Sequence, residues 1–208
     1  MDFTSARQNM VESQVRTSDV TDLQVQEAMR SVHRERFVAP ARAALAYADA
    51  EVEYAPGRRL MRPRDVAKLL QAVRPYAGER ALAIAAPYAA ALMARIGLQV
   101  TAVEAEDSDA HVRLALEGEA VTVGAGDLRN PGGGPYDVIV CEGAVERVPA
   151  GWLTLLAEKG RLGVVLRRGP AGKAMIYVRT GEAFGAREAF DAAAPYLSGF
   201  EPKSAFVF

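Results

Sequence analysis

Apolar residues recur at helical spacing in the first third of the chain and at strand spacing further on. In the N-terminal part they lie three and four positions apart, which predicts helices. The residues that carry this spacing are Met10, Val11, Val15, Leu23, Val25, Ala28, Met29 and Val32. Residues 64–73 repeat the pattern after a loop marked by Pro56 and Gly57. We therefore expect an N-terminal helical cover and loop over residues 1–75.

From Arg80 onward, short apolar runs alternate with helix-like spans. The strand candidates are residues 81–85, 100–103, 120–123, 138–141 and 161–166, and the helix candidates are residues 88–96, 108–117 and 151–157. This alternation predicts right-handed crossovers and a mostly parallel sheet covered on both faces. Alternating segments at residues 175–178 and 205–208 would suit antiparallel strands at one sheet edge. The expected fold class is α/β, a doubly wound Rossmann-like core over residues 76–208 within a single domain.

Composition and charge limit the partners. A chain of 208 residues, half of them apolar, can bury one sizeable core, so a single domain over residues 1–208 is the default. The net charge is −1, from 25 basic and 26 acidic residues, and gives no general field that would attract nucleic acid or an anionic membrane. We expect neither as a partner, and the sequence leaves the oligomeric state open.

Cysteine and histidine are scarce. Cys141 is the sole cysteine, which excludes an internal disulfide and fits a reducing compartment. The N-terminus lacks a charged leader followed by an apolar segment, and no apolar run approaches the roughly 18 residues of a membrane span. His33 and His111 lie in distant sequence contexts without a tight carboxylate cluster. We expect a cytoplasmic protein without a transition-metal site.

Several short motifs occur in an order that is more specific than any one of them. They are Arg7-Gln8-Asn9-Met10-Val11 followed by Gln14, the segment Val32-His33-Arg34-Glu35-Arg36-Phe37-Val38, Tyr47-Ala48-Asp49, Gly126-Asp127, Pro135-Tyr136-Asp137-Val138-Ile139-Val140, and Val148-Pro149. Together they resemble the protein-L-isoaspartate O-methyltransferase family across nearly the whole chain. The resemblance implies a methyltransferase fold of the Rossmann-like type.

The resemblance also implies an activity. Members of that family transfer a methyl group from S-adenosylmethionine to the free carboxylate of isoaspartyl residues in damaged proteins or peptides. Carried over to this chain, it implies S-adenosylmethionine as the cofactor and an isoaspartate-containing protein or peptide as the substrate. Two segments depart from the family pattern.

The first departure lies in the acceptor loop. The family sequence Gly-Gln-Thr-Ile-Ser-Gln-Pro corresponds here to residues 57–63, which place Arg59 at the threonine, Met61 at the serine and Arg62 at the following glutamine. The resemblance therefore assigns these three residues to the catalytic acceptor position. Methyl transfer depends on holding the acceptor in line, and a thioether cannot donate the hydrogen bond that a serine hydroxyl provides.

The second departure lies in the cofactor loop. The family sequence Glu-Ile-Gly-Thr-Gly-Ser-Gly-Tyr aligns with Ala83-Ile84-Ala85-Ala86-Pro87-Tyr88, which lacks every glycine. By resemblance Ala85, Ala86 and Tyr88 would contact the methionyl end of the cofactor. Glycine allows the backbone to approach that group closely, whereas alanine adds a β-carbon and Pro87 removes an amide donor. A structural alternative is that Pro87 is an ordinary first residue of a helix.

The remaining cofactor candidates are acidic. Glu104 ends the second strand, where a carboxylate of this fold accepts hydrogen bonds from the ribose hydroxyls, and Asp127 follows the third, where the family aspartate meets the adenine amino group. The alternative for both is a solvated acid at a strand end.

Other residues have structural and functional interpretations. The cluster Arg58, Arg59, Arg62 and Arg64 could bind an anionic ligand or form a solvated, internally paired loop. Cys141 could act as a nucleophile only beside a base, so we expect it to pack in the core. Trp152 could stack on a purine, but packing of a helix start against the sheet is the simpler interpretation.

The sequence thus supports two hypotheses. The chain is either a methyltransferase of the resembled family, or a non-catalytic homologue that binds a nucleoside-like or anionic ligand or a protein partner, because activity resides in the site and not in the fold.

Overall fold

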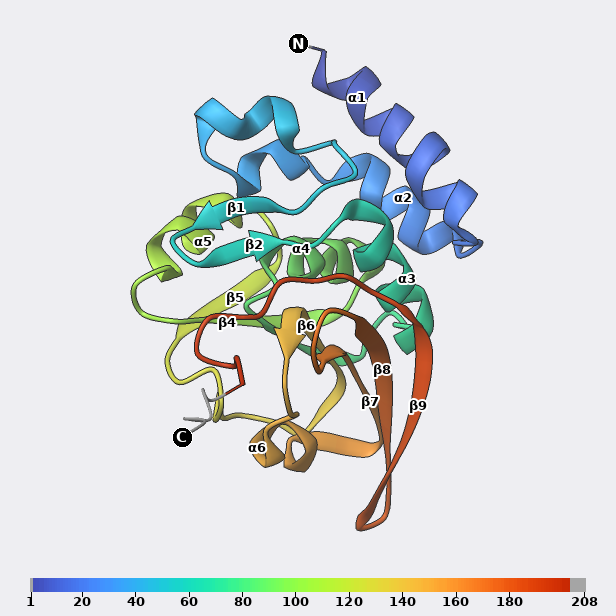
Figure 1. The fold of residues 1–208 in the computed structure, drawn as a ribbon, viewed down its shortest axis with the longest axis vertical. Helices are drawn as coiled ribbons and strands as arrows, with labels where there is room; N and C mark the ends of the chain where they lie inside the picture. Colours follow the sequence, from blue (N-terminus) through green and yellow to red (C-terminus); the bar gives the residue numbers. More distant parts are fainter. Residues whose placement is uncertain (1, 203–208) are drawn as a thin grey trace.

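The computed structural model describes residues 2–202 and contains a central sheet with helices on both faces (Figure 1). Within these residues, seven strands form the sheet in the order β5-β4-β3-β6-β7-β8-β9. Their bounds are β3 (Arg80–Ile84), β4 (Gln99–Glu104), β5 (Val121–Ala125), β6 (Tyr136–Val145), β7 (Leu156–Arg167), β8 (Gly172–Thr180) and β9 (Ala183–Asp191). Pairs from β5 to β7 are parallel, and β7-β8 and β8-β9 are antiparallel. The predicted α/β fold, with its antiparallel edge, is confirmed.

The helices lie in the N-terminal cover and between the parallel strands. They are α1 (Phe3–Met10), α2 (Leu23–Ser31), α3 (Pro63–Val73), α4 (Pro87–Ile96), α5 (Asp109–Ala115) and α6 (Ala150–Thr154). Shorter turns are η1 (Val11–Val15), η2 (Arg16–Ser18), η3 (Arg34–Phe37) and η4 (Pro40–Leu45). Asp2 and Asp22 begin α1 and α2 by accepting hydrogen bonds from first-turn amides.

Side chains of the central strands alternate between two hydrophobic cores. Ala81 and Ala83 of β3 face the core beneath α2, α3 and α4, whereas Leu82 and Ile84 face the core around α6 and Trp152. This alternation follows from the two-residue period of a strand. Because both faces are covered at the centre of the sheet, residues 81–84 of β3 and 138–141 of β6 are continuous apolar runs.

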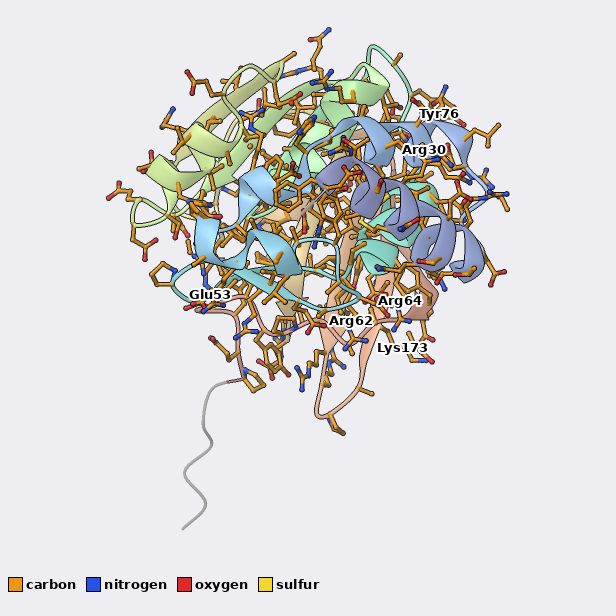
Figure 2. All side chains as sticks on the ribbon, turned by 90° about the horizontal axis from the view of Figure 1, so that it is seen from above. Arg30, Glu53, Arg62, Arg64, Tyr76 and Lys173 are labelled. Atoms are coloured by element: carbon orange, nitrogen blue, oxygen red, sulfur yellow. The ribbon has the colours of Figure 1, made fainter. Side chains whose placement is uncertain are left out.

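The N-terminal cover packs directly on the sheet layer. Figure 2 shows it from above, with Arg30 and Glu53 labelled on that side of the molecule. Its buried residues, such as Met10 and Met29, belong to the same hydrophobic cluster as the β3 alanines. We therefore propose that residues 1–208 form a single domain, since the cover and the core share one interior.

Two predicted elements differ from the structure, and one strand was not predicted. The segment marked by Pro56 and Gly57, expected as a loop, forms a hairpin of β1 (Val52–Ala55) and β2 (Arg58–Leu60) with these two residues at its turn. The helix expected over residues 151–157 ends at Thr154 because β7 begins at Leu156, which pairs with Tyr136 of β6. The strand β9 was missed, and the edge segment predicted at residues 205–208 lies outside the described residues.

No helix among residues 2–202 is both long and apolar enough to cross a lipid bilayer.

Gly163 of β7 lies directly against side chains of α3. A β-carbon at this position would lie 2.8 Å from Val73 Cγ1 and 3.1 Å from Leu69 Cδ1. We expect Gly163→Ala to lower the free energy of unfolding by about 1–3 kcal/mol, because the helix must move outward. Urea denaturation measures this change. As a control, Gly185→Ala on β9 meets no atom within 4 Å and should change stability by less than about 0.5 kcal/mol; equal costs for both variants would contradict the packing argument.

Candidate functional site

Three parallel strands end together at one edge of the sheet, which is where ligands bind in open α/β folds. Ile84 of β3 pairs with Val103 of β4 and with Cys141 of β6. The residues that follow these positions are neighbours at that edge: Ala85, Glu104 and Glu142. The sequence had placed Ala85 and Glu104 in the cofactor site, and the structure brings them together.

Glu104 is enclosed, and both of its carboxylate oxygens accept hydrogen bonds from the chain. The residue is 1% exposed. Oε1 accepts hydrogen bonds from Arg58 Nε at 2.9 Å and from the Ala105 amide at 2.9 Å, while Oε2 accepts one from the Tyr54 hydroxyl at 2.6 Å. Arg58 and Tyr54 are themselves buried. The oxygens expected to meet ribose hydroxyls therefore already have protein donors.

The β1-β2 hairpin places these donors because of strand alternation. On β2, Arg58 and Leu60 point into the protein, whereas Arg59 between them is exposed. On β1, Tyr54 also reaches the strand ends, and its ring stacks on His111 of α5 with centroids 6.1 Å apart. Burial, followed by the charge of Glu104, holds the pKa of Tyr54 well above its usual value, so the hydroxyl remains a donor.

The loop after β3 keeps a glycine-like backbone without a glycine. Ala85 has φ of +46°, a left-handed conformation that glycine adopts readily and alanine rarely does. Ala85 and Ala86 are 1% and 2% exposed, and Pro87 begins α4. The interpretation of Pro87 as a first helical residue is confirmed. The methyl groups of both alanines are enclosed where the resemblance places the methionyl group.

The buried carboxylate of Glu142 lies at the N-terminal end of α4. Its Oε1 accepts the Ala89 amide at 2.8 Å and its Oε2 the Met61 amide at 3.2 Å. Burial raises its pKa, although the positive charge of Arg34 and the two amides oppose that shift. A carboxylate of the chain thus lies at the helix end where the anionic part of a nucleotide cofactor usually binds.

The acceptor-loop residues point in different directions. Met61 is 1% exposed, and its carbonyl accepts a hydrogen bond from the buried Arg34 at 2.6 Å. Arg59 lines a small cavity of about 270 Å³ together with Glu142. Arg62 instead donates to Glu51 at 2.9 Å, away from that cavity. The structure therefore does not gather the predicted catalytic positions around one point, and their roles remain predictions.

The arginine cluster does not form a single anion site. Arg58 is bound to Glu104, Arg62 to Glu51, and Arg64 lies 3.1 Å from Asp49. These ion pairs agree with the alternative in which the arginines of this loop are paired with acidic residues of the same chain.

Asp127 and Tyr88 make mainly structural contacts. Asp127 is exposed at the end of β5 and accepts hydrogen bonds from the Arg129 amide and the Asn130 side chain, which lower its pKa. Tyr88 is fully buried, and the Arg34 guanidinium lies 4.5 Å from its ring centroid. Burial raises the Tyr88 pKa, and its hydroxyl has no hydrogen-bond partner within the described chain.

Cys141 and Trp152 belong to the core, as predicted. Cys141 is fully buried, and that burial raises its pKa strongly, which disfavours a thiolate. Trp152 donates its indole proton to the Leu128 carbonyl at 2.7 Å and packs near Phe200. Among residues 2–202, no three His, Cys, Asp or Glu side chains are grouped to hold a metal ion.

The sequence analysis did not identify Tyr54 and Glu142 as site residues, and it did not predict that the Arg58 side chain points inward. One sequence signal was available for the hairpin residues. Val52, Glu53 and Tyr54 alternate in polarity before the Pro56-Gly57 turn, and the two-residue period of a strand would have placed Arg58 on the same face as Leu60. The partner of Arg58, however, is 46 positions away in sequence.

The order of the strands, the helical cover and the acidic residues at the strand ends define the class of protein. The chain has the Rossmann-like fold of methyltransferases. Residues 5–184 match the family profile described as protein-L-isoaspartate(D-aspartate) O-methyltransferase. The protein-L-isoaspartate O-methyltransferase of Methylorubrum extorquens is 36% identical over 178 residues, covering 82% of this chain and 77% of the relative. That of Methylorubrum populi is 37% identical over 175 residues, covering 81% and 82%. The chain belongs to the protein-L-isoaspartate O-methyltransferase family.

Solved structures agree on the fold. A protein-L-isoaspartate O-methyltransferase structure aligns with a TM-score of 0.77 and 22% identity, covering 93% of this chain and 66% of that one. A Plasmodium falciparum structure assigned to the same family, in complex with S-adenosyl-L-homocysteine, gives a TM-score of 0.73 at 18% identity, covering 95% and 99%.

Family membership supports S-adenosylmethionine as the cofactor and isoaspartyl-containing proteins as the substrates on which the family acts. The residues at the strand ends do not fit that cofactor in the arrangement described. Both carboxylate oxygens of Glu104 already accept hydrogen bonds from the protein, and the loop from Ala85 to Pro87 is enclosed. No step of methyl transfer can be derived from this geometry.

The buried pair Arg58–Glu104 can be tested by a double-mutant cycle. Arg58→Met or Glu104→Gln should each lower the free energy of unfolding by about 3–5 kcal/mol, because each leaves a buried charge unpaired. The double variant should lose much less than the sum of both. Urea denaturation of the four proteins measures the coupling.

The chain offers a matched control for this cycle. Arg62 and Glu51 are also joined at 2.9 Å, but their side chains are 29% and 20% exposed. Their coupling, measured with Arg62→Met and Glu51→Gln, should stay near 0.2–1 kcal/mol, roughly the value of accessible pairs. A coupling for Arg58–Glu104 no larger than this control would refute the structural role of the buried pair.

Proposed function

We propose that this chain is a non-catalytic member of the protein-L-isoaspartate O-methyltransferase family, which uses the fold for binding. The observation that carries the proposal is the engagement of Glu104 by Arg58, Tyr54 and the Ala105 amide. A ribose would have to displace a buried, charge-assisted hydrogen bond to reach this carboxylate. Such bonds are among the strongest in proteins.

The acceptor side supports the same proposal. Transfer to a carboxylate requires donor and acceptor to be held in line. Met61, at the position of the family serine, is buried and offers only a weakly accepting thioether. Arg59 is the acceptor-loop side chain that lines the cavity beside Glu142, and its charge could hold a carboxylate but would not by itself position a methyl donor.

A second candidate is the family activity itself, with S-adenosylmethionine as donor and an isoaspartyl protein or peptide as acceptor, in the cytoplasm. The observation that favours it is the position of Glu104 and Asp127 at adjacent strand ends, where Glu104 pairs with Ala125 of β5. This function requires the β1-β2 hairpin to withdraw Arg58 from Glu104.

Calorimetric titration with S-adenosyl-L-homocysteine separates the candidates. We expect no heat of binding at millimolar ligand for this protein, because its strand-end site is closed by its own side chains. The Methylorubrum extorquens relative serves as a positive control under identical conditions. Affinity in the micromolar range, which corresponds to about −8 kcal/mol, would overturn the closure of the strand-end site on which the proposal rests.

A binding result would call for a second measurement. Transfer of labelled methyl from S-adenosylmethionine to an isoaspartyl peptide, absent with the matched aspartyl peptide, would establish the family activity. Binding without transfer would retain the loss of catalysis and remove only the steric explanation for it.

A further inference from the structure

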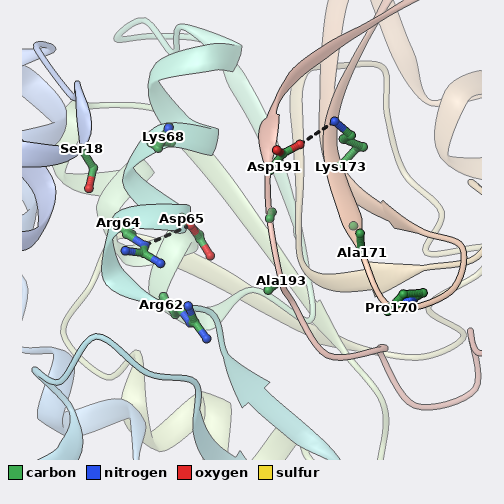
Figure 3. Close-up of a pocket in the computed structure, with 12 residues that line it drawn as sticks. Ser18, Arg62, Arg64, Asp65, Lys68, Pro170, Ala171, Lys173, Asp191 and Ala193 are labelled. Carbon is green, nitrogen blue, oxygen red and sulfur yellow. Dashed lines mark ion pairs between the residues drawn. The ribbon is translucent and has the colours of Figure 1, made fainter.

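A second cavity lies between α3 and the antiparallel edge of the sheet, apart from the strand-end site. Its volume is about 550 Å³, which is in the range of small-ligand pockets. Figure 3 shows Arg62, Arg64, Asp65 and Lys68 on the α3 side, with Asp191 and Lys173 opposite. Figure 2 shows Arg62, Arg64 and Lys173 near one another on the same region of the surface.

Asp65 is a buried carboxylate in this wall that lacks hydrogen-bond donors. Its side chain is 8% exposed, and the nearest cation, Arg64 Nε, lies 3.7 Å away, beyond hydrogen-bonding distance. No donor among residues 2–202 bonds to its carboxylate oxygens. Burial raises the pKa of Asp65, although Arg64 and Arg62 oppose the shift. The carboxylate oxygens of Asp65 are not fully shielded from solvent, because they open into the cavity, and a ligand there can donate hydrogen bonds to them.

Lys68 carries the matching unpaired cation. It lies one turn beyond Asp65 on α3, a spacing at which opposite charges can pair. It pairs neither with Asp65 nor with any other carboxylate of the described chain, and its ammonium instead lies 4.9 Å from the centre of the Phe190 ring. Asp65 and Lys68 thus both line the cavity without pairing with each other, and the long Arg64–Asp65 ion pair leaves the Asp65 oxygens without a hydrogen bond.

The other charges at the cavity are neutralised. Arg62 is paired with Glu51, Arg64 with Asp49, and Lys173 with Asp191 at 2.5 Å. The rest of the wall includes small apolar residues: Pro170, Ala171, Ala192 and Ala193.

We propose that this cavity binds a small zwitterion of the amino-acid class, with its ammonium group on Asp65, its carboxylate on Lys68 and an apolar side chain against the Pro170–Ala171 and Ala192–Ala193 wall. A ligand carrying only positive charge would be repelled by Lys68. A simple anion would meet Asp65 and the nearby acids. The zwitterion satisfies both groups, whether or not the strand-end site binds S-adenosylmethionine.

The probes are L-leucine, N-acetyl-L-leucine and L-leucinamide, titrated by NMR into the full-length protein. We expect saturable binding of L-leucine and about a tenfold loss on N-acetylation or amidation, since each removes one charge-assisted contact. Asp65→Asn should weaken L-leucine about tenfold by the same reasoning. Lys68→Met should weaken L-leucine but strengthen L-leucinamide, because that ligand has no carboxylate for Lys68 to bind and its positive charge is repelled by the lysine.

Glu182→Gln, in the turn between β8 and β9 and outside the cavity lining, is the charge-loss control and should bind as the unaltered protein does. The comparison of three ligands on the unaltered protein needs no variant, so the proposal stays testable if Asp65→Asn fails to fold. Absence of saturation with L-leucine at millimolar concentration, equal binding of the N-acetyl compound, or an unchanged affinity in Asp65→Asn would each overturn it.

Discussion

The hydrogen bonds around Glu104 are the constraint on which the site depends. A carboxylate that is 1% exposed requires donors and a counter-charge, since an unpaired buried charge is strongly unfavourable. The β1-β2 hairpin supplies both through Tyr54 and Arg58, which ties a segment outside the main sheet to the end of β4. The hairpin is therefore part of the interior and encloses the edge at which ligands of this fold bind.

The buried carboxylate of Glu142 connects the acceptor loop to the start of α4. Glu142 accepts amides from Met61 and from Ala89 of α4, while Arg34 of the N-terminal cover donates to the Met61 carbonyl and, at 2.8 Å, to that of Ala46. The cover, the acceptor loop and the start of α4 are thus connected by bonds buried away from water. Altering any one of these segments would leave charged or polar groups of the other two without partners, which is costly in a low-dielectric interior.

Much of the architecture could be predicted because its signals are local. The apolar runs at β3, β4 and β6 predicted the parallel sheet, and the ordered motifs from Arg7 to Pro149 indicated the family that the comparisons support. The β1-β2 hairpin and β9 were not predicted, for physical reasons. The β1-β2 hairpin is short, and β9 is an edge strand with mostly exposed side chains, so its pattern lacks the alternation of a half-buried strand.

The sequence by itself determined the fold class, the family, the loss of glycine from the cofactor loop and the replacement of the acceptor serine by Met61, because these depend on residue type and order. Only the tertiary structure decided which donors Glu104 receives, that Arg59 and Arg62 separate, and that Asp65 and Lys68 face one cavity without pairing. The reason is that buried charge pairs join residues far apart in the chain. Whether a carboxylate is free for a ligand depends on those long-range contacts, which no local pattern records.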